Sequence, residues 1–351
     1  MNFTALHLEP KERHEALDAA CERILDIQSE DGAIAWFENG PWDPWNHTEC
    51  VMALFVVGQH EAALKGLDYL AQTQLDDGSW LGEYGNALAM VDNLTMARTK
   101  APAFHDTNFA AYCAVGVWHA SHFDSAVLRK YWPMVEKAMA FVMSLQTDAG
   151  DILWSLEATT CGPEDAVLAG NSSIYKSMEA ALLIAAQINV DAKHIKEARE
   201  RLGHVLRNRP DLFDRDETDR SEFAMDWYYP VFCGALDKAT AINRLNDGWR
   251  TYVATDRGCK CVSSEPWVTV AETCELALTL ASVDQTDIAK SLLKAIMPYR
   301  TDTGCFWMGW QYDEKLMWPQ ETPSWTQAAY ILAVDALYAL SPAHRVLVDH
   351  D

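Results

Sequence analysis

The sequence predicts an all-α protein in which six helical hairpins close into an (α/α)6 toroid, with an inner and an outer ring of helices. Two observations carry this prediction: a turn cassette recurs along the chain, and six apolar helices align without gaps. The 351 residues are 49% hydrophobic and 23% charged, an ordinary globular composition that can bury a large core. We therefore expect a single domain over residues 1–351, ending in a short tail at 341–351.

The recurring cassette consists of the end of an amphipathic helix, a polar turn that contains glycine, aromatic residues and then an apolar helix. Glycine permits the positive φ that ends a helix and turns the chain. The four clear turns end in glycine shortly before a tryptophan, in the pairs Gly32 and Trp36, Gly78 and Trp80, Gly150 and Trp154, and Gly304 and Trp307.

The apolar helices that follow the turns share one register position, and we expect them to form the inner ring. Three residues later the register carries a small residue in five of six copies, which lets neighbouring helices approach closely. Amphipathic stretches at 60–74, 124–146, 191–207 and 284–298 are expected to form the outer ring. An open solenoid is the structural alternative, but the terminal copies are as hydrophobic as the middle ones. The shared position is occupied by Cys50, Cys113, Met178, Cys233, Cys274 and Tyr330.

The charge balance limits the partners of the protein. Its formal net charge of -23 repels phosphate backbones and anionic lipid surfaces, so we expect no nucleic acid and no integral membrane association. The first residues contain Pro10 and charges instead of an apolar signal stretch, which favours a cytoplasmic protein. The nine cysteines lack a tight disulfide spacing and are interpreted as reduced core residues.

Aspartate and asparagine recur seven residues before the shared register position, where the inner helices are expected to begin. Such residues are favoured N-caps, because their side-chain oxygens accept hydrogen bonds from free N–H groups of the first turn. All inner helices of a toroid start at one face, so the same residues would also ring the mouth of a cavity. The six positions are Asp43, Asp106, Asn171, Asp226, Trp267 and Pro323.

Carboxylates and aromatic residues near this mouth make the candidate site. General acid–base chemistry would use Asp106, Asp226, Asp43, His105 or His47, although a histidine at a helix start is commonly structural. For Glu272 the alternative is a structural role, since the sequence from Thr269 to Glu272 matches a capping box. The expected substrate-binding residues are Trp36, Trp45, Glu49, Asn108, Asn171, Trp227, Tyr228, Trp267, Glu272, Trp307, Trp310, Glu321 and Trp325.

One turn resembles a motif of a known superfamily. The stretch from Tyr69 to Trp80, which reads YLAQTQLDDGSW, is similar to the QW repeat of terpene cyclases and of protein prenyltransferase β-subunits. The resemblance implies an α/α toroid that handles isoprenoids, with Asp106 or Asp226 as proton donor. At the protonating motif of the cyclases, Asp-x-Asp-Asp-Thr, this chain reads His105-Asp106-Thr107, with histidine in the place of the proton-donating aspartate.

The prenyltransferase side of the resemblance would add a zinc site. Asp302, Cys305 and His47 resemble parts of it, in repeats that would be neighbours after ring closure. Zinc needs its ligands to converge tetrahedrally, and unrelated core and turn residues are the alternative interpretation. We therefore predict no cofactor, with zinc or magnesium as an alternative.

Three functions remain open at this point. The first is an isoprenoid-handling enzyme that uses general-acid chemistry in an aromatic pocket. The second is a carbohydrate-active α/α-barrel enzyme, a hydrolase, lyase or epimerase, that uses paired carboxylates, because aromatic faces also stack on sugar rings. The third is a non-catalytic toroid that binds a small molecule. Basic residues are scarce near the mouth, which disfavours a diphosphate leaving group.

Overall fold

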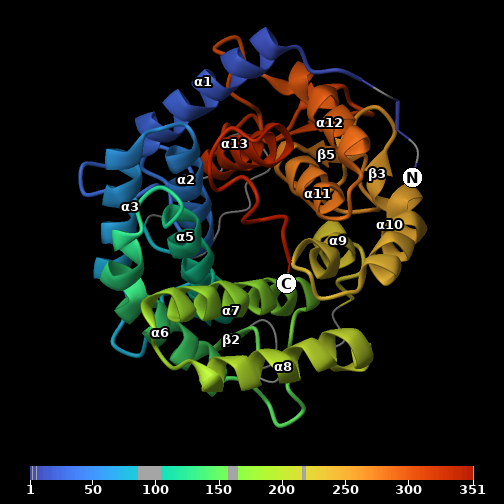
Figure 1. Ribbon diagram of the computed structural model, residues 1–351. Coiled ribbons are helices and arrows are strands. Elements are labelled where there is room, and N and C mark those ends of the chain that lie inside the picture. The colour runs from blue at the N-terminus through green and yellow to red at the C-terminus, as the bar shows by residue number, and fades with distance from the viewer. Residues whose placement is uncertain (2, 5, 86–103, 157–164, 216–218, 351) are drawn as a thin grey trace.

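The computed structural model describes the chain except for residues 2, 5, 86–103, 157–164, 216–218 and 351. Its helices lie in two concentric layers (Figure 1). The inner layer holds α2 (Pro44–Val56), α4 (Thr107–Ala111) with α5 (Cys113–Ala120), α7 (Leu168–Ile188), α9 (Ala224–Phe232), α11 (Val270–Ser282) and α13 (Ser324–Tyr338). The outer layer holds α1 (Pro10–Ile27), α3 (His60–Thr73), α6 (Ala126–Ser144), α8 (Lys193–Asn208), α10 (Lys238–Tyr252) and α12 (Thr286–Ala295).

The inner helices pack on one another in chain order. Helix α2 contacts α5, and the contacts continue through α7, α9 and α11 to α13, which packs back on both α2 and α1. Ser324 at the start of α13 also donates from its hydroxyl to Ala35 O at 2.7 Å, 289 residues away in sequence. The predicted α-helical toroid type of fold is therefore confirmed, and the register position of each apolar copy lies in an inner helix or at its C-cap.

Glutamine side chains attach the turns to the outer layer. Gln74 Nε2 donates to Gly78 O within its own turn and to Met134 O on α6, both at 2.9 Å. Trp80 is buried, and its Nε1 donates to Leu70 O at 3.1 Å. Gly78 has a φ of +91°, and a Cβ there would lie 2.2 Å from Lys137 O on α6. Gln28 and Gln146 repeat both hydrogen bonds in their own turns.

Inner helices hold the other end of three of the turns. His47 Nδ1 accepts a hydrogen bond from Ile34 N at 3.1 Å, and its Nε2 donates to Gly66 O at 2.9 Å. In two further repeats an amide side chain on the inner helix accepts a hydrogen bond from a backbone N–H just after the turn. Asn171 Oδ1 accepts from Ile152 N, and Gln327 Oε1 accepts from Phe306 N.

The helix starts agree with the predicted caps in part. Asp43 caps α2 and Asp106 caps α4 through hydrogen bonds from Asn46 N and Phe109 N, and Thr269 caps α11. Asn171 and Asp226 are not caps, because α7 and α9 begin a few residues before them. Of the remaining two positions, Trp267 lies in a strand and Pro323 caps α13 without a side-chain hydrogen bond.

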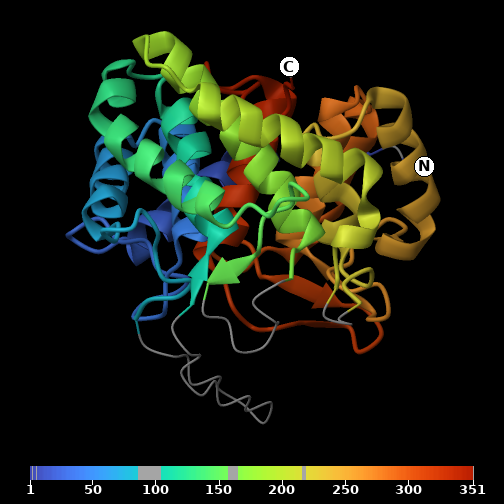
Figure 2. The same ribbon diagram turned by 90° about the horizontal axis from the view of Figure 1, so that it is seen from below.

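Short strands gather at the face where the inner helices start (Figure 2). They are β1 (His105–Asp106) with β2 (Ser155–Leu156), β3 (Val253–Ala254) with β4 (Gly258–Cys259), and β5 (Trp267–Thr269), β6 (Gly309–Gln311) and β7 (Leu316–Met317), all paired antiparallel. After α13 the chain returns over the centre of the inner layer at the opposite face, where Val346, Leu347 and Val348 are buried. In the described part of the chain, no helix is long and apolar enough to cross a membrane.

Candidate active site

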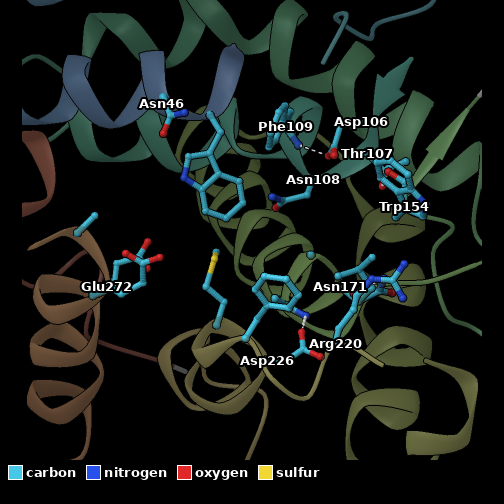
Figure 3. Close-up of a pocket in the computed structure, with 18 of the residues that line it drawn as sticks. Asn46, Asp106, Thr107, Asn108, Phe109, Trp154, Asn171, Arg220, Asp226 and Glu272 are labelled. Carbon is cyan, nitrogen blue, oxygen red and sulfur yellow. Dashed lines mark hydrogen bonds between the residues drawn. The ribbon is translucent and has the colours of Figure 1, made fainter. Parts of the chain in front are cut away.

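A cavity of about 450 Å³ opens at the face where the inner helices start. Every inner helix except α5 contributes to its wall, and side chains from separate repeats surround one space (Figure 3). The lining includes Trp45 and Glu49 from α2, Asn108 from α4, Asn171 from α7, Asp226 from α9, Glu272 and Glu275 from α11, and Trp325 from α13. The cavity thus lies at the predicted end of the inner helices, where they start.

The cavity is strongly acidic. Five carboxyl groups line it, and Arg220 is the single basic residue among the described lining residues. Arg220 is itself paired with Asp165 at 3.0 Å and Asp214 at 2.8 Å. Such a wall offers almost no positive charge to an anionic ligand, and its carboxyl groups can hydrogen-bond a neutral, hydroxyl-rich one. The five carboxyl groups belong to Glu49, Asp106, Asp226, Glu272 and Glu275.

Asp106 and Asp226 hold their protons more tightly than ordinary aspartates. Burial raises the pKa of each to about 7, and nearby Asp43 and Asp214 respectively add to the effect. Asp106 Oδ1 accepts the capping hydrogen bond from Phe109 N at 2.9 Å. Asp226 Oδ1 accepts a longer one from Ala169 N at 3.3 Å. Both groups are therefore partly protonated near neutral pH and able to donate a proton there.

Glu272 has a different environment. It is the third residue of α11, and half of the predicted capping box forms: Thr269 Oγ1 accepts from its backbone N–H and also donates to its carboxylate. It is also only partly buried. Its side chain therefore belongs both to the first turn of α11 and to the cavity wall.

Glu49 and Glu275 lie deeper, among tyrosines. Tyr228 and Tyr229 donate to the two oxygens of Glu275, the second at 2.7 Å, and Tyr112 OH donates to Glu49 Oε1 at 3.4 Å. Burial raises the pKa of Glu275 to about 7 and that of Glu49 well above its ordinary range, and the charge of Glu275 contributes to the shift of Glu49. The two carboxyls therefore resist carrying two negative charges together.

Aromatic rings complete the wall. Trp45 stacks on Tyr112 with ring centroids 4.8 Å apart and meets Phe109 edge-on at 6.0 Å. Trp325 meets Trp36 edge-on at 5.5 Å. Because Trp45, Phe109 and Trp325 also line the cavity, rigid aromatic surface faces the same space as the carboxyl groups. This combination suits the binding of a sugar ring.

Several predicted catalytic residues lie outside the cavity lining. Asp43 is buried and accepts hydrogen bonds from Trp36 Nε1 at 2.6 Å and from Asn46. Both ring nitrogens of His47 bind backbone groups, and burial lowers its pKa to about 4. His105 Nδ1 lies 2.6 Å from Ser79 Oγ. These residues hold turns and helix starts in place.

Most of the aromatic residues that were predicted to bind substrate pack against other side chains and do not line the cavity. Trp227 stacks on Tyr252 at 5.0 Å, and Trp310 stacks on Tyr299 at 6.1 Å. Trp267 Nε1 donates to Trp318 O at 2.7 Å. None of these three lines the cavity, and the same holds for Trp36, Tyr228, Trp307 and Glu321.

The residues of the zinc hypothesis do not converge. The described residues contain no group of three or more histidine, cysteine or acidic side chains with metal-binding geometry. Cys305 Sγ lies 3.3 Å from Thr301 Oγ1 in its own turn, and His47 has no free ring nitrogen. Asp302 is on the same exposed turn.

Several lining residues were not among the predicted site residues. Glu275 lies three residues after Glu272 on the same helix face, so helical spacing could have identified it. Trp154 follows a predicted turn but had no assigned role. Arg220, Phe223 and Met225 come from the loop before α9 and its first turn, where no repeat register applies.

Comparison with known proteins decides between the three functions. No family model matches the chain. A curated relative, the MMP endo-(1,4)-3-O-methyl-alpha-D-mannosidase of Mycolicibacterium hassiacum, is 37% identical over 327 residues, which cover 93% of this chain and 87% of the relative. The chain belongs to the family of this mannosidase. It is therefore a glycosidase.

Solved structures of glycosidases share the fold. A glycosidase variant superposes with a TM-score of 0.72 at 12% identity, covering 95% of this chain and all of the other. A second glycosidase variant, in complex with glucose, gives 0.71 at 12% identity, with the same coverage. The GH63 mannosylglycerate hydrolase from Thermus thermophilus, also with glucose, gives 0.62 at 11% identity, covering 91% and 99%. At such low identity these likenesses support the fold alone.

The predicted kinship with terpene cyclases and protein prenyltransferases is wrong, and so is the isoprenoid function. The mannosidase relationship covers nearly the whole chain and overturns both. The physical reason lies in the QW-like turn, because Gln74, Gly78 and Trp80 bind backbone groups of the toroid and none of them lines the cavity. The motif holds a turn in place, and enzymes that catalyse unrelated reactions can share such a structural motif.

Proposed function

We propose that this glycosidase cleaves α-(1,4) bonds inside chains of 3-O-methylmannose. The observation that carries the proposal is the 37% identity to an enzyme named for this activity, spread over 93% of the chain. The cavity supports it, because an acidic, aromatic-lined wall suits a neutral sugar that carries apolar methyl groups. We also infer that the chain is one domain of six helical hairpins closed into a ring, since α13 packs on both α1 and α2.

We infer that Asp226 is the general acid. A general acid must hold a proton near the working pH, and burial raises the pKa of Asp226 to about 7. Asp106 has a similar pKa, but its Oδ1 caps α4, and two backbone N–H groups bind its carboxylate. Asp226 does not cap its own helix, since the N-cap of α9 is Phe223. Its carboxyl accepts one long backbone hydrogen bond, from Ala169 N in the first turn of α7 at 3.3 Å, so it is less tied to the backbone than Asp106.

Glu272 is assigned as the general base. A base must reach a water molecule, and Glu272 is partly exposed and lines the cavity. Helices α9 and α11 pack against each other, so the acid and the base project from neighbouring inner helices into one cavity. Figure 3 shows Glu272 and Asp226 on different sides of that space.

The reaction then follows the general scheme of glycoside hydrolysis. Asp226 donates its proton to the glycosidic oxygen as the bond from that oxygen to the anomeric carbon breaks. Glu272 takes a proton from a water molecule, whose oxygen forms the new bond to the anomeric carbon. The products are two shorter sugar chains, and one water molecule is consumed.

The experiment is a product analysis with purified protein. The substrates are α-(1,4)-linked oligosaccharides of 3-O-methylmannose, the same oligosaccharides without methyl groups, and α-(1,4)-linked glucose oligosaccharides as control. The proposal predicts internal cleavage of the methylated mannose chains, seen as products of intermediate length. Cleavage of the glucose chains in preference to both mannose chains would contradict it.

A further inference from the structure

Two polar atoms in the cavity wall have no hydrogen-bond partner among the described residues. They are the side-chain oxygen of Asn108, Oδ1, and the indole nitrogen of Trp154, Nε1. Asn108 is 7% exposed, and both residues line the cavity. A buried polar atom that has lost water without gaining a partner is unfavourable, so two in one wall call for an explanation.

The backbone fixes both side chains in place. Asn108 is the second residue of α4 and lies against α7, where a Cβ added at Gly170 would be 3.7 Å from the Asn108 Cβ. The carbonyl oxygen of Trp154 accepts hydrogen bonds from Thr107 N and Thr107 Oγ1, both at 3.0 Å. Adjacent residues of one helix start therefore hold both unsatisfied atoms at the cavity.

The two atoms have opposite hydrogen-bonding character. Asn108 Oδ1 can only accept a hydrogen bond, and Trp154 Nε1 can only donate one. A sugar hydroxyl can do both, so the hydroxyl groups of a bound sugar can satisfy the two atoms. A methyl ether oxygen keeps its lone pairs but has no hydrogen to donate. It could therefore accept from Trp154, but it would leave Asn108 unsatisfied.

We propose that Asn108 and Trp154 form a hydroxyl-recognition subsite, in which Asn108 requires one unmethylated hydroxyl on the sugar bound in the cavity. The inference rests on the proposed glycosidase function and deepens it. It means that the enzyme distinguishes sugars by the position of their methyl ethers. A methyl group on the hydroxyl that faces Asn108 removes the donor and adds bulk at a closed wall.

The first test compares the wild type with Asn108→Ala. The substrates are an aryl α-mannoside and its four mono-O-methyl ethers, and the measured quantity is kcat/KM. For the wild type, one ether is expected to react at least about tenfold more slowly than the others. In Asn108→Ala this difference shrinks to about twofold or less, because no acceptor remains to be left unpaired.

Two results separate the inference from the proposed function. If the wild type hydrolyses none of the mannosides or mannose chains, the proposed function fails and the inference fails with it. If the wild type is active but Asn108→Ala keeps the full preference among the ethers, or no ether is disfavoured at all, only the inference is overturned.

The second test is Trp154→Phe, which removes the N–H and keeps an aromatic ring. We expect kcat/KM to fall about tenfold while the melting temperature stays unchanged or rises, because the N–H has no described protein partner to lose. Trp118→Phe is the matched control, since Trp118 is also half-buried but lines a small space at the other end of the ring. Unchanged kinetics, or a loss accompanied by an equal fall in the control, would overturn the inference.

Discussion

Asp226 and Glu272 occupy the same place in two successive inner helices, the third residue, yet their surroundings give them different chemistry. Asp226 is buried, and the charge of Asp214 adds to the rise of its pKa to about 7. Glu272 is more exposed and shares its capping box with Thr269. Burial thus favours a proton on Asp226, while Thr269 holds the carboxyl of Glu272 at the start of α11.

Replacing Glu272 by Gln should lower kcat by about 10²- to 10⁴-fold, because a neutral amide cannot take a proton from water. The folding stability should change little, since Gln also suits the capping box. The measurement is steady-state hydrolysis of a mannose oligosaccharide, with melting temperature as a check of the fold.

Glu321→Gln provides the matched control for this prediction. Glu321 is a half-buried carboxyl that was predicted near the mouth but does not line the cavity. Its replacement is expected to leave kcat within about threefold. An equal loss of kcat in the two variants would show that Glu272 is not the general base.

At the scale of helices and turns, the sequence predicted most of what the structure shows. The inner-helix register works because the turns are fastened to both layers: the turns at Gly32 and Gly150 are held by a glutamine on the outer side and by an inner-helix side chain on the other. Asp106 and Asp226 could be picked out because they occupy one fixed position in that register, and Glu272 because it ends a capping-box sequence near the mouth. Arg220 and Phe223 could not, because the loop before α9 is held by long-range ion pairs such as that of Arg220 with Asp165.

Gly78→Ala should destabilise the fold strongly. The residue has a positive φ of +91°, and a Cβ would lie 2.2 Å from Lys137 O, which is backbone that cannot move aside easily. Gly58→Ala is the matched control, because Gly58 has a φ of +80° and no atom within 4 Å of the added Cβ.

Both variants carry the strain of an alanine at positive φ, so their difference isolates the contact with α6. The free energy of unfolding, measured with urea, should fall by about 1–3 kcal/mol more in Gly78→Ala than in Gly58→Ala. Equal losses would show that the turn does not need this close approach.

At the scale of the whole molecule, the cavity gathers carboxyl groups that resist ionisation. This arrangement is costly for folding, because the unfolded chain ionises the same groups near pH 4. The sequence could not predict the function, since an aromatic and acidic wall fits several classes of ligand. The QW-like turn indicates only the toroid fold. The substrate depends on which hydroxyl meets which side chain, and that is set by contacts between repeats.

The free energy of unfolding should therefore depend on pH, and Asp226→Asn should change this dependence. Between about pH 4 and pH 7 the folded wild type keeps a proton on Asp226 that the unfolded chain loses, so this group makes the free energy of unfolding fall as pH rises. Buried His47 and His119, whose pKa values are lowered to about 4 and about 3, act in the opposite direction.

The comparison between wild type and Asp226→Asn cancels the histidine contribution. The variant should gain stability relative to the wild type across this range, by at most about 1.4 kcal/mol per pH unit. Urea unfolding at about pH 4.5 and about pH 7 measures the gain. A relative stability that does not change with pH would show that Asp226 titrates as an ordinary aspartate.

The most direct test of the account is the kinetics of Asp226→Asn on two mannosides that differ in the leaving group. A general acid matters most when the leaving oxygen is basic, as in a sugar chain, and little when it is a good leaving group, as in a nitrophenyl mannoside. We predict a loss of about 10²- to 10⁴-fold in kcat/KM on the mannose oligosaccharide and a much smaller loss on the nitrophenyl mannoside. Equal losses on both substrates, or full activity on the oligosaccharide, would contradict the assignment of Asp226 as the proton donor of this glycosidase.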